Sequence, residues 1–332
     1  MILQNVGFRK DAGRKLLNAW KSILDDHEPD LIIADHAPGA VFAGLDVIPH
    51  LCAIGNGFFV PPPVFPLPNF YGMRPDCIPT FEFISKIENE VTTTINGWRE
   101  TACVPTFPTI GSVFDRLDAQ FLTTFAELDH YSVQRDQAFS GALQYDPPDR
   151  NEYKWPSGVG PRVFAYLKKS RGLGHLFNQI RDLGIPTIVV MDSMDVGRLN
   201  RLATANLSFY DRPLPIERLS RECNFAVLNA GHGATCAFLR AGKPILQLPH
   251  NSEQSSTAVR TIEMNAGLVA HPDDGEQITR SFLTMLSNHD SFPGASEFAE
   301  RYRTYDPRAG AALIAGQIDQ LVSRSSSRRL KK

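Results

Sequence analysis

The fold of this chain is decided by residues 223–254, CNFAVLNAGHGATCAFLRAGKPILQLPHNSEQ. The apolar run 225–228 leads into the turn Gly-His-Gly at 231–233, and the helical stretch that follows ends at Gly242. A second apolar run at 245–248 comes next. This order of buried strand, glycine turn, helix and buried strand predicts a parallel α/β unit.

The same alternation extends along most of the chain. Further strands are expected where apolar residues follow one another, at 31–34, 51–54, 163–167, 187–190 and 207–210. Helices are expected where apolar residues recur at helical spacing, at 16–24, 81–99, 110–128, 176–183 and 216–223. We therefore expect an α/β protein with two Rossmann-like, doubly wound domains.

The domain boundary is expected within residues 146–160, DPPDRNEYKWPSGVG, which are rich in proline, glycine and charge. Such a composition without apolar periodicity is typical of an interdomain linker. We expect a first domain at 1–150, a linker at 151–160 and a second domain at 161–323. The remaining residues, 324–332, include five basic side chains and are expected to form a solvated tail.

The start of the first domain is unusual. The helical stretch 16–24 comes before the first clear strand, whereas a doubly wound domain normally opens with its central strand. Residues 1–8, MILQNVGF, contain one weak apolar cluster. We expect a truncated first domain that is incomplete at its N-terminal end, and marginally stable because part of its apolar surface lacks a partner.

Charge and cysteine content exclude several functional classes. With 34 basic and 36 acidic residues the formal net charge is -2, so no global positive field exists to hold a nucleic acid or an anionic membrane. The five scattered cysteines form no C-x-x-C pair and are typical neither of a disulfide scaffold nor of a zinc site. The sequence has no apolar run of membrane-spanning length and no signal-peptide pattern. We expect a soluble cytoplasmic protein without a metal.

The glycine turn at 231–233 is the candidate ligand site. The free N–H groups of a first helical turn attract an anion, and glycine lets a phosphate approach the backbone. Glu253 and Gln254 follow the next strand at its carboxyl end, where open α/β sheets bind ligands. A diphosphate fits this pattern, although strand-glycine-helix turns also occur without a ligand. The dinucleotide fingerprint is disfavoured because Cys236 replaces its third glycine.

These residues resemble the donor-binding segment of the inverting, nucleotide-sugar-dependent glycosyltransferases of GT-B architecture, the UDP-glycosyltransferase and macrolide glycosyltransferase group. That family has H-G-G-x-G-T at the strand end, then A-G-x-P, then an acidic residue followed by Gln. Residues 241–244 (AGKP) and 253–254 (EQ) match in full, and 229–234 (NAGHGA) match in part. Residues 29–35 (PDLIIAD) and 54–62 (IGNGFFVPP) independently resemble acceptor-domain segments of bacterial members.

The resemblance implies a GT-B fold and a hexosyltransferase that moves a sugar, with inversion, from a UDP- or dTDP-linked donor to a hydroxyl of a small-molecule or lipid-like acceptor. A base of the first domain takes the hydroxyl proton, and no metal or other cofactor is required. Asp35 stands where members place the aspartate that orients the catalytic histidine. Donor binding is implied for Asn229, Gly231, His232, Gly233, Ala234, Thr235, Glu253 and Gln254.

Departures from the family pattern leave the catalytic base unassigned. Asn229 replaces the phosphate-contacting histidine and carries no positive charge, while Ala230 and Ala234 replace a glycine and a threonine. His36 is next to Asp35, but adjacent residues of a strand point to opposite faces. The alternative function is therefore a truncated or catalytically silent relative that binds nucleotide sugar as an accessory subunit.

Three features have competing interpretations. Residues 270–274, AHPDD, resemble the zinc motif of deacetylases acting on N-acetylglucosamine derivatives, but only His289 follows them, so the family's ligand set cannot be completed. Asp35 could instead cap the following helix. The phenylalanines and prolines between 58 and 83 could line an apolar acceptor site or serve ordinary packing.

Overall fold

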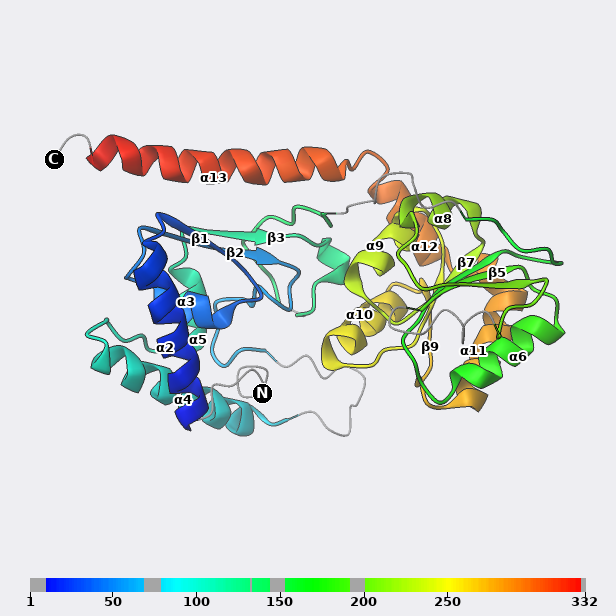
Figure 1. Ribbon diagram of the computed structural model, residues 1–332, viewed down its shortest axis with the longest axis horizontal. Coiled ribbons are helices and arrows are strands. Elements are labelled where there is room, and N and C mark those ends of the chain that lie inside the picture. The colour runs from blue at the N-terminus through cyan, green and yellow to red at the C-terminus, as the bar shows by residue number, and fades with distance from the viewer. Residues whose placement is uncertain (1–9, 69–78, 132, 144–152, 192–200, 330–332) are drawn as a thin grey trace. The chain divides into compact units, whose positions relative to one another are not determined.

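The computed structural model describes residues 10–68, 79–131, 133–143, 153–191 and 201–329 (Figure 1). The chain divides into two compact units. Unit 1 contains the described residues up to Leu143 together with the segment that begins at Asp306, and unit 2 contains the described residues between them, up to Tyr305. Residues 1–9, on which the expectation of a truncated first domain depends, lie outside the described residues.

In the part of unit 1 that the structure describes, three parallel strands form a sheet in the order β1-β2-β3. Leu31 is paired with His50, and Cys52 with Ala119. The strands are β1 (Leu31–Asp35), β2 (His50–Gly55) and β3 (Ala119–Leu122). The helices that belong to this part of the unit are α2 (Lys10–His27), α3 (Pro38–Gly44), α4 (Phe81–Thr101), α5 (Ile110–Asp115) and the short η2 (Ala126–Leu128).

The expected helix at 110–128 is wrong, because α5 ends at Asp115 and the chain then forms β3. The cause is a contact with β2. The backbone N–H of Asp118 donates to the Leu51 carbonyl at 3.0 Å, and the Asp118 carboxylate accepts from the Leu51 N–H at 2.8 Å. These bonds bring the next four residues alongside β2, a pairing that a short apolar run does not reveal by itself.

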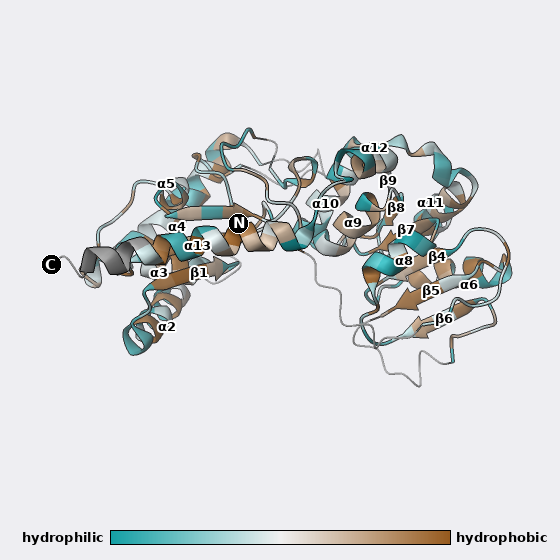
Figure 2. Ribbon diagram, turned by 90° about the horizontal axis from the view of Figure 1, so that it is seen from above, coloured by the Kyte–Doolittle hydropathy of each residue, from teal (hydrophilic) through white to brown (hydrophobic). Residues whose placement is uncertain are grey.

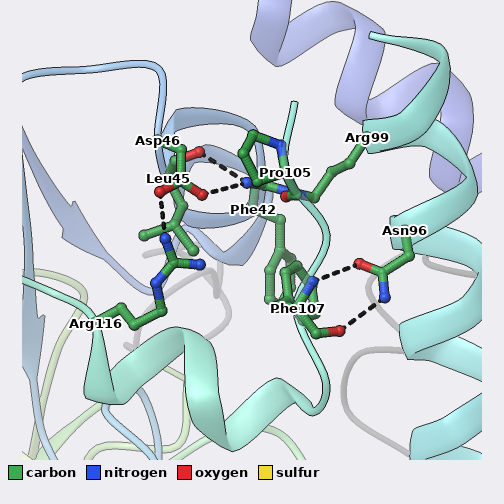
Figure 3. A network of polar contacts seen from close by, with 8 residues as sticks. All are labelled: Phe42, Leu45, Asp46, Asn96, Arg99, Pro105, Phe107 and Arg116. Carbon is green, nitrogen blue, oxygen red and sulfur yellow. Dashed lines mark hydrogen bonds and ion pairs between the residues drawn. The ribbon is translucent and has the colours of Figure 1, made fainter. Parts of the chain in front are cut away.

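One face of the unit 1 sheet packs against α2 and α3, and these helices pack in turn against α4. Leu17, Phe42 and Ile95 are fully buried in this core. A buried ion stabilises the joint between α3 and α4 (Figure 3): the Arg99 guanidinium is inaccessible to solvent and donates to the carbonyls of Phe42 at 2.7 Å and Leu45 at 3.0 Å. It also pairs with the Asp46 carboxylate at 2.7 Å. Burial lowers the pKa of Arg99, and Asp46 opposes that effect.

The other face of this sheet is covered by α13 (Pro307–Arg329), the last helix of the chain. Ile314 of this helix packs against Cys52 and Phe121. The expected boundaries are therefore corrected: residues from Asp306 belong to unit 1 rather than to a second domain at 161–323, and the helix continues into the expected tail at 324–332. The helix joins unit 1 because the apolar face of β2 and β3 requires a cover.

Unit 2 contains, among its described residues, six parallel strands in the order β6-β5-β4-β7-β8-β9. The strands are β4 (Val163–Tyr166), β5 (Thr187–Val190), β6 (Leu207–Tyr210), β7 (Phe225–Leu228), β8 (Ile245–Gln247) and β9 (Gly267–Val269). The helices are α6 (Leu173–Asp182), α8 (Ile216–Glu222), α9 (His232–Arg240), α10 (Ser252–Glu263), α11 (Gly275–Asn288) and α12 (Pro293–Arg301), with η3 (His289–Ser291).

The central strands of unit 2 are buried on both faces, which explains their unbroken apolar runs. All four residues of β5 and of β7 are buried, and the hydropathy colouring of Figure 2 marks β5 as hydrophobic. Part of the expected linker also belongs to this unit. The Tyr153 hydroxyl and the Trp155 indole N–H both donate to the Glu222 carboxylate, at 2.9 and 2.7 Å.

The cover provided by α13 leads to a prediction. We expect Ile314→Ala to lower the free energy of unfolding of unit 1 by about 2–4 kcal/mol, because it leaves a cavity against Cys52 and Phe121. The neighbouring Leu313 is 63% exposed, so Leu313→Ala should change it by less than about 0.5 kcal/mol. Urea denaturation, monitored by hydrogen exchange of the β2 amides, measures the free energy of unfolding of both variants. Equal losses in the two variants would contradict the packing of α13 on this sheet.

Candidate functional site

The carboxyl ends of β4, β7 and β8 lie side by side in unit 2. Tyr166 of β4 is paired with Leu228 of β7, and Leu228 with Gln247 of β8. The pairing continues past the strands, because Asn229 N–H donates to the Tyr166 carbonyl at 3.1 Å. The strand order reverses between β4 and β7. Such a switch point is where open α/β sheets bind ligands.

The predicted glycine turn connects β7 to α9 at this edge. Gly231 is the N-cap residue of α9, and no side chain caps the helix. The N–H groups of the first turn therefore have no side-chain acceptor from the cap position, and the helix dipole makes this end attractive to an anion. The stack of Phe164 on Phe238, with ring centroids 5.3 Å apart, holds α9 against β4.

The two glycines of the turn are not required by the fold. A Cβ atom on Gly233 would meet no heavy atom within 4 Å, and one on Gly231 would meet only the Asn229 side-chain oxygen, at 3.5 Å. Gly231 has an ordinary φ of −66°. In contrast, Ala230 has a φ of +57°, where glycine would be less strained. Glycine is thus found where open space faces the helix N-terminus rather than where the backbone needs it.

The other predicted donor-binding residues have different environments. Asn229 is buried, and Thr235 is fully buried with its hydroxyl accepting a hydrogen bond from the Gln247 amide at 3.2 Å. The Thr235 side chain therefore faces the protein interior, which leaves Gly233 and the half-exposed His232 and Ala234 at the surface of the turn.

The loop after β8 is organised by Gln254. The Gln254 side-chain oxygen accepts from the His250 N–H at 2.8 Å, and its own N–H donates to Asn251, the N-cap residue of α10, at 3.0 Å. Gln254 is buried, while Glu253 beside it is half-buried. The predicted acidic-Gln pair therefore starts α10 at the same sheet edge as the glycine turn.

Unit 1 contains an apolar cavity of about 60 Å³ at the carboxyl ends of β1 and β2. Its wall is mainly aromatic and aliphatic, and includes Phe58, Phe59, Phe114, Tyr131, Leu67 and Ile110. Of the phenylalanines and prolines between 58 and 83, for which the sequence left an acceptor wall or ordinary packing open, Phe58, Phe59 and Pro61 line the cavity. Burial raises the pKa of the Tyr131 hydroxyl, so this group stays protonated.

His36 lines this cavity and Asp35 does not. His36 lies one residue beyond the end of β1, with a φ of +44°, and its ring contacts that of Phe59 in a tilted arrangement with centroids 4.1 Å apart. The alternation of strand residues therefore does not fix the direction of its side chain. Asp35 is exposed and does not cap α3, whose N-cap residue is Ala37 without a side-chain bond.

Sequence reasoning missed Glu88, a buried carboxylate of α4. It accepts from the Leu67 N–H at 2.6 Å and from the Ile110 N–H at 3.2 Å, and both of these residues line the cavity. Burial raises the pKa of Glu88, and these hydrogen bonds oppose the rise. The sequence contained one indication that Glu88 is buried, because its position falls on the same helical stripe as the buried Val91 and Ile95.

The motif at 270–274 is the loop between β9 and α11. Asp274 accepts from the Gln277 N–H at 2.9 Å and caps α11, while Asp273 accepts from the Arg171 N–H at 2.9 Å. Among the described residues, no group of three or more His, Cys, Asp or Glu side chains could hold a metal ion.

Comparison with known proteins identifies similar glycosyltransferases, although no protein-family profile matches the chain. The chain is 24% identical over 306 residues to the PGL/p-HBAD biosynthesis glycosyltransferase of Mycobacterium tuberculosis. The alignment covers 87% of this chain and 70% of that relative.

Solved glycosyltransferases share the fold. The calicheamicin glycosyltransferase CalG4 superposes with a TM-score of 0.64 at 15% identity, over 93% of this chain and 79% of that one. VinC in complex with dTDP superposes with a TM-score of 0.60 at 16% identity, over 94% of this chain and 76% of that one. The spinosyn rhamnosyltransferase SpnG complexed with spinosyn aglycone superposes with a TM-score of 0.59 at 17% identity, over 92% of this chain and 82% of that one. The expected α/β GT-B fold is confirmed. Within the described residues, no helix has the length and apolar character needed to cross a membrane.

The position of Glu88 leads to a prediction. We expect Glu88→Gln to lower the free energy of unfolding of unit 1 by about 1–3 kcal/mol, because one of the two buried backbone N–H groups then faces an amide NH₂. Glu90 on the same helix is exposed, so Glu90→Gln should change it by less than about 0.5 kcal/mol. Urea denaturation compares them. A Glu88→Gln variant as stable as Glu90→Gln would show that Glu88 does not hold the cavity wall.

Proposed function

We propose that this chain, whose fold is the GT-B fold of glycosyltransferases, transfers a sugar from a nucleoside diphosphate sugar to a hydroxyl of an acceptor. The observation that carries the proposal is the open space in front of Gly231 and Gly233 at the uncapped start of α9. Backbone N–H groups at a helix N-terminus suit a diphosphate. The relative from M. tuberculosis is a glycosyltransferase, and VinC was solved with dTDP, which supports a UDP- or dTDP-linked donor.

The reaction would be a single displacement with inversion. The acceptor oxygen attacks the anomeric carbon from the face opposite the diphosphate, the bond from that carbon to the diphosphate oxygen breaks, and a base takes the hydroxyl proton. Negative charge accumulates on the leaving diphosphate, and the first-turn amides of α9 are oriented to stabilise it. Glu253 and Gln254 would bind sugar hydroxyls. No metal or other cofactor is part of this proposal.

The acceptor would bind in unit 1. The apolar cavity there offers aromatic faces to an apolar molecule, which favours a small-molecule or lipid-like acceptor of hexosyl groups. SpnG was solved with an aglycone, which supports an acceptor of this kind. Asp35 would orient the base, whose identity is not assigned.

A silent nucleotide-sugar-binding protein is the second candidate. Asn229, a neutral residue at the carboxyl edge of β7, favours it, because the histidine of the family pattern can carry positive charge and asparagine cannot. The two candidates are separated by release of UDP or dTDP from a nucleotide sugar: a transferase turns the donor over when the acceptor is supplied, and the silent relative binds it without turnover.

The diphosphate site can be tested with Gly233→Val. A branched side chain at this position would block the approach of a phosphate, so we expect at least a tenfold weaker Kd for UDP or dTDP by calorimetry. The fold should tolerate the change, because Val is slightly better than Gly in a helix and the site is open.

Gly174 offers a matched control. It is also the second residue of a helix, α6, and a Cβ there also meets no atom within 4 Å. Gly174→Val should leave the Kd within twofold. Binding by the parent chain should also persist in EDTA. Equal affinities in both variants, or loss of binding in EDTA, would contradict the site as proposed.

A further inference from the structure

We propose that Lys168 is a further donor-binding residue, whose ammonium group contacts the diphosphate and stabilises it as the leaving group. The inference rests on the proposed function and deepens it, because it assigns a lysine charge to the diphosphate beside the backbone N–H groups of α9. The first turn of α9 offers backbone dipoles, and Asn229 offers only a neutral amide. A departing nucleoside diphosphate gains negative charge, for which a lysine is a suitable partner.

Strand register brings Lys168 to the glycine turn. Tyr166 of β4 is paired with Leu228 of β7, and Asn229 N–H donates to the Tyr166 carbonyl at 3.1 Å. Lys168 comes two residues after the end of β4, and Ala230 comes two residues after the end of β7, so both follow strand ends that are paired with each other. Neighbouring strands are about 4.8 Å apart. The lysine therefore follows β4 at the sheet edge where β7 leads into α9.

The position of His250 supports this placement from the other side of β7. His250 follows β8, whose neighbour is β7, and it starts the loop that leads to Glu253. Burial lowers the pKa of His250, and the positive charge of Lys168 makes the next largest contribution to this lowering. Asp273 raises this pKa and His271 lowers it further. The Lys168 charge thus acts across the end of β7, where the diphosphate is proposed to bind.

Lys168 is also available for a ligand. It is exposed, and within the described part of the chain it forms no hydrogen bond or ion pair. Arg171 in the same loop is different, because its guanidinium lies 3.4 Å from the Asp273 carboxylate and its backbone N–H also donates to that group. Lys169 is exposed like Lys168, but it is not among the charged groups that shift the pKa of His250.

The test uses the full chain and three variants, Lys168→Gln, Lys168→Arg and Lys169→Gln, with UDP and dTDP as probes in calorimetry. We expect Lys168→Gln to weaken the Kd at least tenfold, Lys168→Arg to restore it to within about threefold, and Lys169→Gln to change it by less than twofold. Added salt should weaken nucleotide binding more in the parent chain than in Lys168→Gln. Salt screens the attraction between the Lys168 charge and the diphosphate, and the variant lacks that charge.

The outcomes separate this inference from the proposed function. If the parent chain binds UDP or dTDP and Lys168→Gln binds it equally well, or no worse than Lys169→Gln, the role of Lys168 is wrong and the proposed function stands. If the parent chain binds neither nucleotide at millimolar concentration, both proposals fail. Melting temperatures of the variants equal to that of the parent chain would show that a loss of affinity is not a loss of folding.

Discussion

The parallel pairing of β4, β7 and β8 is the constraint on which the candidate donor site depends. Backbone hydrogen bonds align Tyr166, Leu228 and Gln247, which are far apart in the sequence, at one level of the sheet. Because parallel strands end at the same edge, this alignment brings together Lys168, the glycine turn and the loop that starts α10. A slip of one residue would turn the buried side chains of β7 to the wrong face and separate these groups.

Unit 1 contains buried charged side chains, among them Arg99 and Glu88. Two side chains of α4 bind backbone groups of other segments: Arg99 holds the carbonyl groups at the end of α3, and Glu88 holds N–H groups of the cavity wall. Both charges are buried, so each is stable only while its partners are in place. The wall of the apolar cavity is thus held by Glu88, while Arg99 of the same helix holds the end of α3.

The turn before α9 shows a preference that packing does not explain. Ala230 takes the left-handed conformation, although glycine would adopt it with less strain, while Gly231 and Gly233 occupy positions that any residue could fill. Glycine inside a helix, as at Gly233, is less favourable than alanine by about 1 kcal/mol. The residue choice at Gly233 follows the space in front of the helix, which agrees with a ligand that approaches the backbone closely.

The sequence by itself determined the α/β class, the strands of unit 2 and the glycine turn, because buried parallel strands are written as local apolar runs and the turn as local glycines. Tertiary structure alone decided the features whose cause lies far along the chain. β3 forms because Asp118 bonds to Leu51, α13 joins unit 1 because β2 and β3 need a cover, and Glu88 is buried because two distant N–H groups require an acceptor. The proposal for Lys168 has the same origin: an exposed lysine has no local pattern that marks it, and only the register of β4 against β7 shows that it follows a strand end next to the one that leads into α9.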